Sequence, residues 1–294
     1  MGKWVLSAEP IKRLERFDIR LKIIEWNINQ QSNIPDEIPQ FIEKIINKKN
    51  PHIAVLTEFK VPKKQEKLDE FTNSLDKYDY NVFYNSESKM VFNEVLIAIK
   101  KDIHVIQTVD KIPNCEDINK HPNFLRVDVE VGDKPLTIIG TRIAVGTEEE
   151  EKQALKKNQF SLLDNYLYQL ETENVICIGD FNAYWGSKWK TKENTSLPKT
   201  SSRYKLFTPN RDIENNIFSF VNSKVEPEDQ GKPYYKQYQT LDHLICKGLE
   251  NVQVSYDWGF LKEPDYKNVC PKCVKDGFRG LPDHAILVAD FTLP

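Results

Sequence analysis

Eight apolar runs with the length and composition of β-strands set the framework of the chain. In one of them, residues 174–181, four consecutive apolar residues lead into Gly179, which is typical of a strand buried on both faces. Amphipathic helical stripes separate some of the runs, whereas other runs follow one another directly. This mixture predicts an α/β fold of two packed sheets with helices outside, in preference to a doubly wound parallel sheet. The runs are 20–28, 52–59, 93–100, 124–131, 135–143, 174–181, 240–247 and 285–291.

No internal repeat and no flexible linker interrupts the 294 residues, so we expect one domain over 20–294 and an N-terminal extension, 1–19, that packs on it or flanks it. The chain is 39% apolar, which is enough to fill a substantial core. No stretch approaches the roughly 18 apolar residues of a membrane span, and charged residues are mixed through the N-terminus, unlike in a signal peptide. We therefore expect a soluble, cytoplasmic protein with no membrane partner, and the sequence indicates no obligate protein partner.

Cysteine usage argues against a disulfide scaffold, because the chain has only five cysteines, an odd number. Cys177 and Cys246 lie in strand-like runs and are expected in the core. The pair Cys270 and Cys273 forms a Cys-x-x-Cys motif that suits two free thiols, half of a zinc site, a redox pair or a plain turn. A structural zinc site needs four ligands and no second such motif is present, so free thiols are favoured.

Polar residues stand at or near one end of five of the apolar runs. Each of them alone is explained by a turn, since Asp and Asn side chains hydrogen-bond to nearby backbone. Five such ends are hard to explain by packing, because burial of uncompensated polar groups is costly, whereas convergence on one polar pocket removes that cost. The residues are Asn27, Glu58, Asp180, Asn182, Asp242, His243, Asp283 and His284.

A pocket of this composition has a definite chemistry. Carboxylates and an amide oxygen are hard ligands, and they suit Mg²⁺ or Mn²⁺, with water and a substrate phosphate completing the coordination. A further Asp can deprotonate water, and a His supported by an Asp can hold phosphate or donate a proton. The residue types therefore point to metal-assisted hydrolysis of a phosphoric ester.

Five motifs, in this order, resemble those of the endonuclease/exonuclease/phosphatase superfamily, which has the deoxyribonuclease I-like fold. They are IIEWNIN, LTEF, GDFNA, LDHLI and LPDHAIL, and the resemblance covers about residues 20–291. It implies a four-layered α/β sandwich, in which two mixed sheets pack face to face with helices on the outer sides. It also implies an active site at one edge of the sandwich.

The resemblance also implies roles for individual residues. Asn27 and Glu58 match the metal-binding Asn and Glu of the superfamily, and Asp283 matches its second metal carboxylate. His243 has no such match. Because it alternates away from Asp242 along a strand, the favoured interpretation of His243 is a core residue.

The catalytic residues follow in the same way. Asp180 matches the Asp that activates the attacking water, and Asn182 matches the Asn that stabilises the phosphorane-like transition state. His284 matches the His that contacts the scissile phosphate, and Asp242 matches the Asp that orients this His. After the strand segment LTIIG, residues 136–140, many members carry a His or Tyr near the scissile phosphate. This chain has Arg142 there, which cannot act as a base but can clamp phosphate.

The superfamily hydrolyses DNA, RNA, phosphoinositides, sphingomyelin and capped or adenylated ends, so the fold does not name the substrate. The formal net charge of −3 does not decide it either. Aromatic and basic residues alternate after GDFN, a composition that suits nucleic-acid bases and backbone, although an ordinary exposed loop is the alternative. We expect a Mg²⁺- or Mn²⁺-dependent nuclease that prefers DNA to RNA; the alternatives are a hydrolase of a small soluble phosphate compound and an inactive binding protein. The predicted substrate-binding residues are Trp185, Lys188, Trp189, Lys190 and Arg203.

Overall fold

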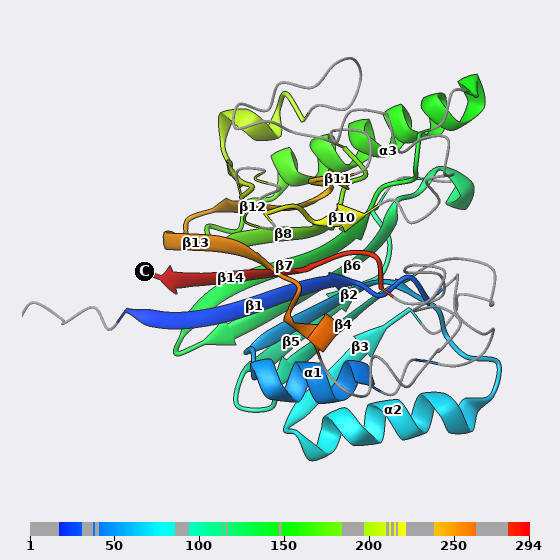
Figure 1. Cartoon of the computed structure of the whole chain (residues 1–294). Coiled ribbons are helices and arrows are strands. Elements are labelled where there is room, and N and C mark those ends of the chain that lie inside the picture. Colours follow the sequence, from blue (N-terminus) through cyan, green and yellow to red (C-terminus); the bar gives the residue numbers. More distant parts are fainter. Residues whose placement is uncertain are drawn as a thin grey trace, which may run out of the picture.

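The computed structural model describes residues 18–30, 38, 41–85, 94–113, 115, 117–146, 149–183, 197–209, 212, 215, 217–221, 238–262 and 282–294. Within these ranges, two six-stranded mixed sheets pack face to face (Figure 1). A separate short pair is formed by β10 (Phe220–Val221) and β11 (Tyr238–Gln239).

The first sheet has the strand order β13-β14-β1-β2-β4-β3. Its strands β1 and β2 run parallel, and all other neighbours run antiparallel. The bounds are β1 (Ile19–Asn27), β2 (Ile53–Phe59), β3 (Tyr80–Tyr84), β4 (Glu94–Lys100), β13 (Glu250–Asp257) and β14 (Ile286–Leu293).

The second sheet has the order β5-β6-β7-β8-β12-β9. Like the first sheet, it has one parallel pair of neighbours, β7 and β8, and its other neighbours run antiparallel. The bounds are β5 (His104–Val109), β6 (Asn123–Val131), β7 (Lys134–Arg142), β8 (Val175–Asp180), β9 (Lys205–Phe207) and β12 (Asp242–Lys247).

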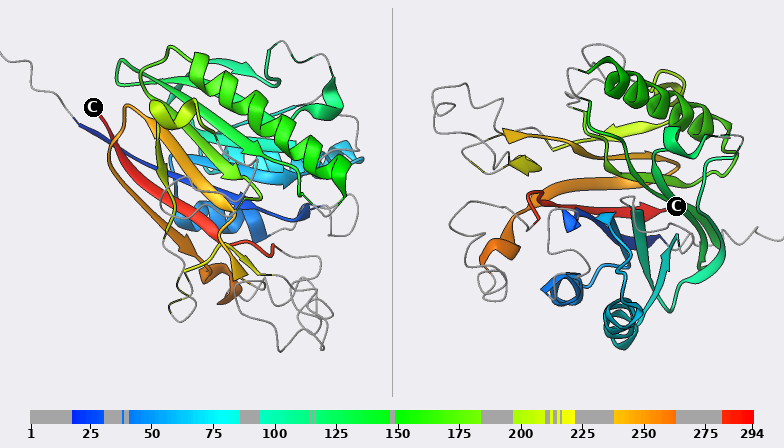
Figure 2. Two further views of the ribbon diagram at one scale, coloured as in Figure 1. Left: turned by 90° about the horizontal axis from the view of Figure 1, so that it is seen from above. Right: turned by 90° about the vertical axis from the view of Figure 1, so that its right-hand side faces the viewer.

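Helices cover the outer faces of both sheets, as the right-hand view of Figure 2 shows. The first sheet carries α1 (Phe41–Lys49) and α2 (Gln65–Lys77), and the second carries α3 (Glu150–Gln169). Short 3₁₀ turns follow at η2 (Ile118–Lys120), η3 (Thr200–Ser202) and η6 (Gly259–Lys262). The predicted four-layered α/β sandwich is therefore confirmed.

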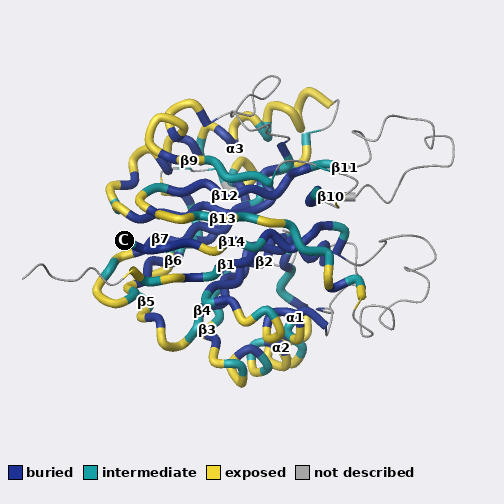
Figure 3. The backbone as a smooth tube through the Cα atoms, turned by 60° about the vertical axis from the view of Figure 1, so that its left-hand side comes forward, coloured by how far each residue is buried: buried dark blue, intermediate teal, exposed yellow. Residues whose placement is uncertain are grey.

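The described core has three parts: one lies between the two sheets, where alternate residues of facing strands point inward, one lies between the first sheet and helices α1 and α2, and one lies between the second sheet and α3. Figure 3 shows the central strands of both sheets as buried, whereas the helices expose their outer sides. Cys177 and Cys246 are buried, as expected from the sequence, and Trp26 and Phe181 are buried as well. Among the described residues, no helix is long and apolar enough to cross a membrane. The proposed boundary of the N-terminal extension stays a prediction, because residues 1–17 lie outside the described ranges.

Strand direction explains why the polar strand ends meet. The parallel strands β1 and β2 end at the same edge of the first sheet, and β7 and β8 end together in the second. In contrast, β12 and β14 begin at this edge, since they run antiparallel to β8 and β1. Asp242, the first residue of β12, is therefore the direct cross-strand neighbour of Asp180, the last residue of β8.

Two local backbone features shape this edge. Gly179 lies so close to β7 that an added Cβ atom would stand 1.8 Å from the carbonyl oxygen of Thr141, so no larger residue fits before Asp180. Glu58 has a left-handed φ of 52°, within an irregularity of the β2–β4 pairing between Leu56 and Phe59. A glutamate in this conformation costs about 1–3 kcal/mol, and such strain is concentrated at functional sites.

Candidate active site

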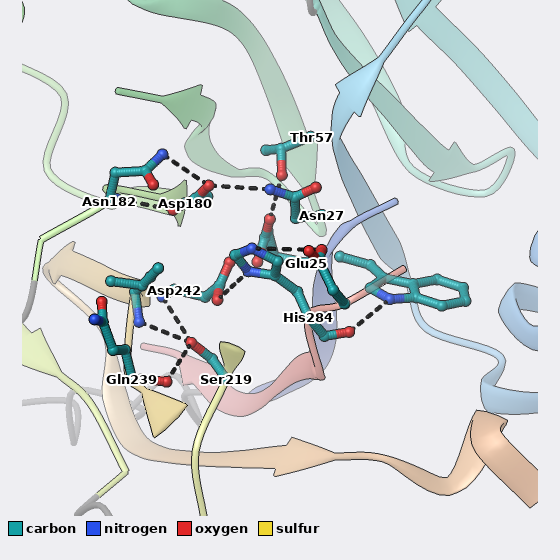
Figure 4. A network of polar contacts seen from close by, with 12 residues as sticks. Glu25, Asn27, Thr57, Asp180, Asn182, Ser219, Gln239, Asp242 and His284 are labelled. Atoms are coloured by element: carbon teal, nitrogen blue, oxygen red, sulfur yellow. Dashed lines mark hydrogen bonds and ion pairs between the residues drawn. The ribbon is translucent and has the colours of Figure 1, made fainter. Parts of the chain in front are cut away.

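Asp180 is the centre of a hydrogen-bonded group at this edge (Figure 4). Its Oδ2 accepts hydrogen bonds from the side-chain amides of Asn27 and Asn182, both at 3.0 Å, and its Oδ1 accepts one from the backbone N–H of Asn182 at 2.8 Å. The carboxylate is only 1% exposed, and burial raises the pKa of Asp180 to about 6. Three donors thus hold a buried carboxylate that titrates close to neutral pH.

The second group is the pair of Asp242 and His284. His284 Nδ1–H donates to Asp242 Oδ2 at 2.8 Å, and Trp26 Nε1–H donates to the backbone carbonyl of His284 at 3.1 Å. Burial opposes the charged form of His284, but the negative charges of Asp242, Asp180 and Asp283 outweigh it and hold the pKa of His284 well above its usual value. The imidazole is therefore a cation at neutral pH, with Nε2 directed away from Asp242.

Arg142 and Glu58 form the third group. Arg142 Nε donates a hydrogen bond to Glu58 Oε1 at 2.9 Å, Nη2 lies 2.7 Å from the same oxygen, and Nε lies 3.8 Å from Asp180 Oδ2. The two side chains are each 13% exposed, so the pair lies closer to solvent than Asp180 does. The sequence prediction placed Arg142 near the phosphate position, and the structure brings it to the same edge as the predicted metal ligands.

Asp283 stands between the second and third groups. Its Oδ1 lies 3.9 Å from His284 Nε2. Burial raises the pKa of Asp283 to about 6, the charge of His284 opposes this rise, and the charge of Glu58 adds to it. Asp283 therefore lies close to His284 and within the electrostatic influence of Glu58.

Glu25 is an additional acidic residue that the sequence prediction did not assign to the site. Its Oε1 accepts a hydrogen bond from Thr57 Oγ1 at 2.8 Å, and the side chain is fully buried between the groups of Asp180 and His284. Burial, followed by the charge of Asp242, raises the pKa of Glu25 well above its usual value. Strand alternation put Glu25 on the same face as Asn27, and this was the available signal.

The donor set fits a divalent cation. Asp180, Asp242 and His284 each offer a ligand atom within 4.8 Å of the other two. Among the described residues, Glu25 Oε2 and Asp242 Oδ1 are buried oxygen atoms without a hydrogen-bond partner, which is the kind of atom that a cation or a proton compensates. Carboxylate oxygens suit Mn²⁺ or Mg²⁺, whereas His284 in its protonated form offers a cation no lone pair.

His243 is a core residue. Its Nε2–H donates to the carbonyl of Ala183 at 2.8 Å and its Nδ1 accepts from Thr208 Oγ1 at 2.6 Å. Burial lowers its pKa to about 4, so the ring is neutral and fixes the loop that follows β8.

Arg203 is not brought to this edge. Its guanidinium donates to the backbone carbonyl of Tyr168 and stands 5.4 Å from the centre of the Tyr168 ring, near the C-terminal end of α3. Lys156, on the same helix, reaches the carbonyl of Asn182, and Tyr168 lies about 18 Å further along the helix axis at 1.5 Å per residue. The proposed substrate contact of Arg203 therefore gains no support from its position. Trp185, Lys188, Trp189 and Lys190 lie outside the described residues, as do Cys270 and Cys273.

Solved structures with the same architecture provide the comparison. No family model matches the chain, and no curated protein matches it. D. rerio TDP2 in complex with a single-strand DNA product aligns with 92% of this chain and 98% of its own, at 14% identity and a TM-score of 0.59. ANGEL2, a 2',3'-cyclic phosphatase, aligns over 94% and 96% at 12% identity and 0.59, and an AP endonuclease from Archaeoglobus fulgidus over 92% and 98% at 17% identity and 0.56. At these identities the likeness shows a shared fold.

Proposed function

We propose, on the basis of the deoxyribonuclease I-like fold that this chain shares with the endonuclease/exonuclease/phosphatase superfamily, that it is a divalent-metal-dependent phosphodiesterase. The observation that carries the proposal is the position of Asp180. This carboxylate is buried, oriented by three N–H donors, and placed opposite the hydrogen-bonded pair of His284 and Asp242.

Asp180 is suited to activate water. Its three donors leave the carboxylate one orientation, and a pKa of about 6 keeps it ionised at neutral pH while it stays basic enough to accept a proton. Asn27 and Asn182 supply these donors. Both hydrogens of the Asn182 amide are used within the protein, on Asp180 Oδ2 and on the Ile143 carbonyl at 2.8 Å, so the first task of Asn182 is to orient Asp180. For Asn182 to stabilise a phosphorane-like transition state, its amide would have to give up one of these two hydrogen bonds.

His284 and Arg142 are suited to hold the phosphate. The imidazolium of His284 presents Nε2–H, because Asp242 occupies Nδ1, and a donor here can stabilise charge that develops on the phosphoryl oxygens. Arg142 pairs with Glu58 through Nε and Nη2, which leaves N–H groups of its five for a phosphate oxygen. A divalent cation held by Glu58, Asp283 and Asn27 would neutralise phosphate charge and polarise the ester.

Nucleic acid is the proposed substrate, with DNA before RNA. One structural neighbour was solved with a single-strand DNA product and another is an AP endonuclease. The aromatic and basic segment that follows Asn182 in the sequence agrees with this proposal, since stacking platforms and positive charge suit a nucleic-acid strand.

Metal-dependent digestion tests the proposal. The substrates are plasmid, linear duplex, abasic duplex, single strands and RNA, each with Mg²⁺ or Mn²⁺ and with a chelator. Asp180→Asn and His284→Ala should each lower turnover by roughly 10²–10⁴-fold and leave the fold intact. The matched controls are Asp290→Asn and His104→Ala, which change exposed residues of β14 and β5. Wild-type turnover in Asp180→Asn would remove Asp180 from the mechanism.

A second candidate function is hydrolysis of a small soluble phosphate ester. It is favoured by the equally strong likeness to ANGEL2, a 2',3'-cyclic phosphatase. Nucleoside 2',3'-cyclic phosphates therefore belong in the same set of substrates. Neutralising Lys188 and Lys190 separates the two functions, because it should weaken turnover of a long strand and leave turnover of a mononucleotide unchanged.

A further inference from the structure

Lys156 of helix α3 reaches the edge at which the candidate active site lies. The ammonium of Lys156 donates a hydrogen bond to the main-chain carbonyl of Asn182. The stem of this lysine passes over Gly146, where an added Cβ atom would stand 2.9 Å from Lys156 Cδ. Both ends of the side chain are thus engaged, the stem with the loop after β7 and the head with the loop after β8.

The residue that Lys156 holds is the one that orients Asp180. Asn182 has a left-handed φ of 49°, and its backbone N–H and side-chain amide both donate to the Asp180 carboxylate. Its amide also donates to the Ile143 carbonyl, so the two loops share one network. Fixing the carbonyl of Asn182 from the other side restricts rotation of the whole residue.

A neighbouring residue of α3 contacts the loop after β7 and the segment that precedes β6. Gln159 accepts a hydrogen bond from the backbone N–H of Ala144 and donates one to the carbonyl of His121, both at 2.7 Å. Gln159 is buried, although glutamine is usually exposed. Two polar side chains, three positions apart on one helix face, therefore hold the loops that directly follow Arg142 and Asp180.

We propose that Lys156 is a positioning residue for the hydrolysis proposed above: its ammonium fixes Asn182 and, through Asn182, the direction of the Asp180 carboxylate. This inference rests on the proposed function. A general base acts only when it is within hydrogen-bond reach of the proton that it removes, and small misplacements of catalytic groups cost up to about 10²-fold in rate. The lysine also retains a positive charge, half-buried, beside the acidic site, where it attracts Asp180.

The test compares Lys156→Met, which keeps the stem and removes the ammonium, with Lys157→Met, which changes an exposed neighbour on the same helix. Lys156→Met should lower kcat by about 10- to 100-fold, with KM and the affinity for Mn²⁺ within threefold of wild type. Lys157→Met should leave all three unchanged. A rise in KM at constant kcat would overturn the inference, because Lys156 would then contact the substrate directly. An unchanged kcat would also overturn it.

Chemical restoration of the ammonium provides a second test, in which the recovery of kcat is measured. Lys156→Cys treated with 2-bromoethylamine acquires an S-aminoethyl group, nearly isosteric with lysine, when the thiolate displaces bromide. This treatment should restore most of the lost kcat, whereas wild type treated in parallel controls for reaction at the native cysteines. Failure to restore kcat after complete modification would contradict a role for the ammonium.

Hydrogen exchange separates failure of this inference from failure of the proposed function. In the absence of substrate, the segment Asp180–Ala183 should exchange faster in Lys156→Met than in wild type or in Lys157→Met. If wild type hydrolyses none of the substrates, the proposed function fails and exchange alone decides whether Lys156 holds the loop. Unchanged exchange would overturn the inference whatever the activity.

Discussion

Replacing Asp180 by Asn should produce a protein whose stability relative to wild type reverses with pH. Burial raises the pKa of Asp180 from the ordinary value of 3.8 to about 6, which corresponds to about 3 kcal/mol at roughly 1.4 kcal/mol for each factor of ten. Because the native state binds the proton more tightly than the unfolded chain, wild type loses this stability as pH rises from about 4 to about 6. The variant has no such group and loses nothing.

The substitution also has a cost that does not depend on pH. Asn at this position keeps one acceptor oxygen and brings two N–H donors toward Asn27 and Asn182, which are donors themselves. Two lost hydrogen bonds at about 1 kcal/mol each make the variant about 2 kcal/mol less stable than wild type below pH 4. Above pH 6 the electrostatic gain outweighs this loss, and the variant should be about 1 kcal/mol more stable.

Urea unfolding at several pH values, with a chelator present, measures this reversal. Groups that titrate in the same way in both proteins cancel in the difference, and Asp290→Asn shows the effect of the same change at an exposed site. The reasoning would be refuted if the difference in free energy of unfolding between variant and wild type stayed constant from pH 4 to pH 7, or changed in the opposite direction. Burial would then not destabilise the ionised form of Asp180.

Four other expectations concern the same site. Gly179→Ala should cost more than about 4 kcal/mol in urea unfolding, because the added methyl group meets the backbone of β7, whereas Gly259→Ala meets only the side chain of Asp257 and should cost much less. The acid limb of kcat/KM should lie at or below about pH 6, where Asp180 ionises, and residual activity of Asp180→Asn should lack this limb. Arg142→Met should lower kcat by about 10²-fold, and Arg142→Lys should recover only part of it, since lysine lacks the planar fork; equal activity of the two variants would exclude a forked contact. Mn²⁺ at a hundred times its Kd should stabilise wild type by about 2.7 kcal/mol in thermal unfolding, and a melting temperature that does not respond to Mg²⁺ or Mn²⁺ would contradict the metal site.

The central strands could be predicted from the sequence, but several edge strands could not. The run 174–181 and the strand β8 (Val175–Asp180) agree closely, because a strand buried on both faces is apolar throughout. By contrast, β5 and β13 were missed. They lie at the edges of the two sheets, where most side chains are exposed and polar residues interrupt the apolar pattern.

The candidate site was predictable to the extent that its residues stand at strand ends. Asp180, Asp242 and His284 were found in this way, and the structure brings them within reach of one another. Glu25 was not assigned, because alternation shows which face a residue occupies but not that an acid lies among other acids. Lys156 gave no signal at all, since a lysine on a helix is usually solvated and its contact with the loop after β8 depends on tertiary packing.

Direct opposition of Asp242 and Asp180 across the β8–β12 ladder would make turnover in the proposed hydrolysis a reporter of correct strand pairing. If β12 slid by one position, His243 would face Asp180, and Asp242 would turn to the opposite side of the sheet, away from His284. A misregistered molecule could keep almost the same secondary structure and compactness, yet it would lack the imidazole partner. The specific activity of a purified sample therefore measures the fraction of molecules with the native alignment, which circular dichroism or light scattering would not resolve.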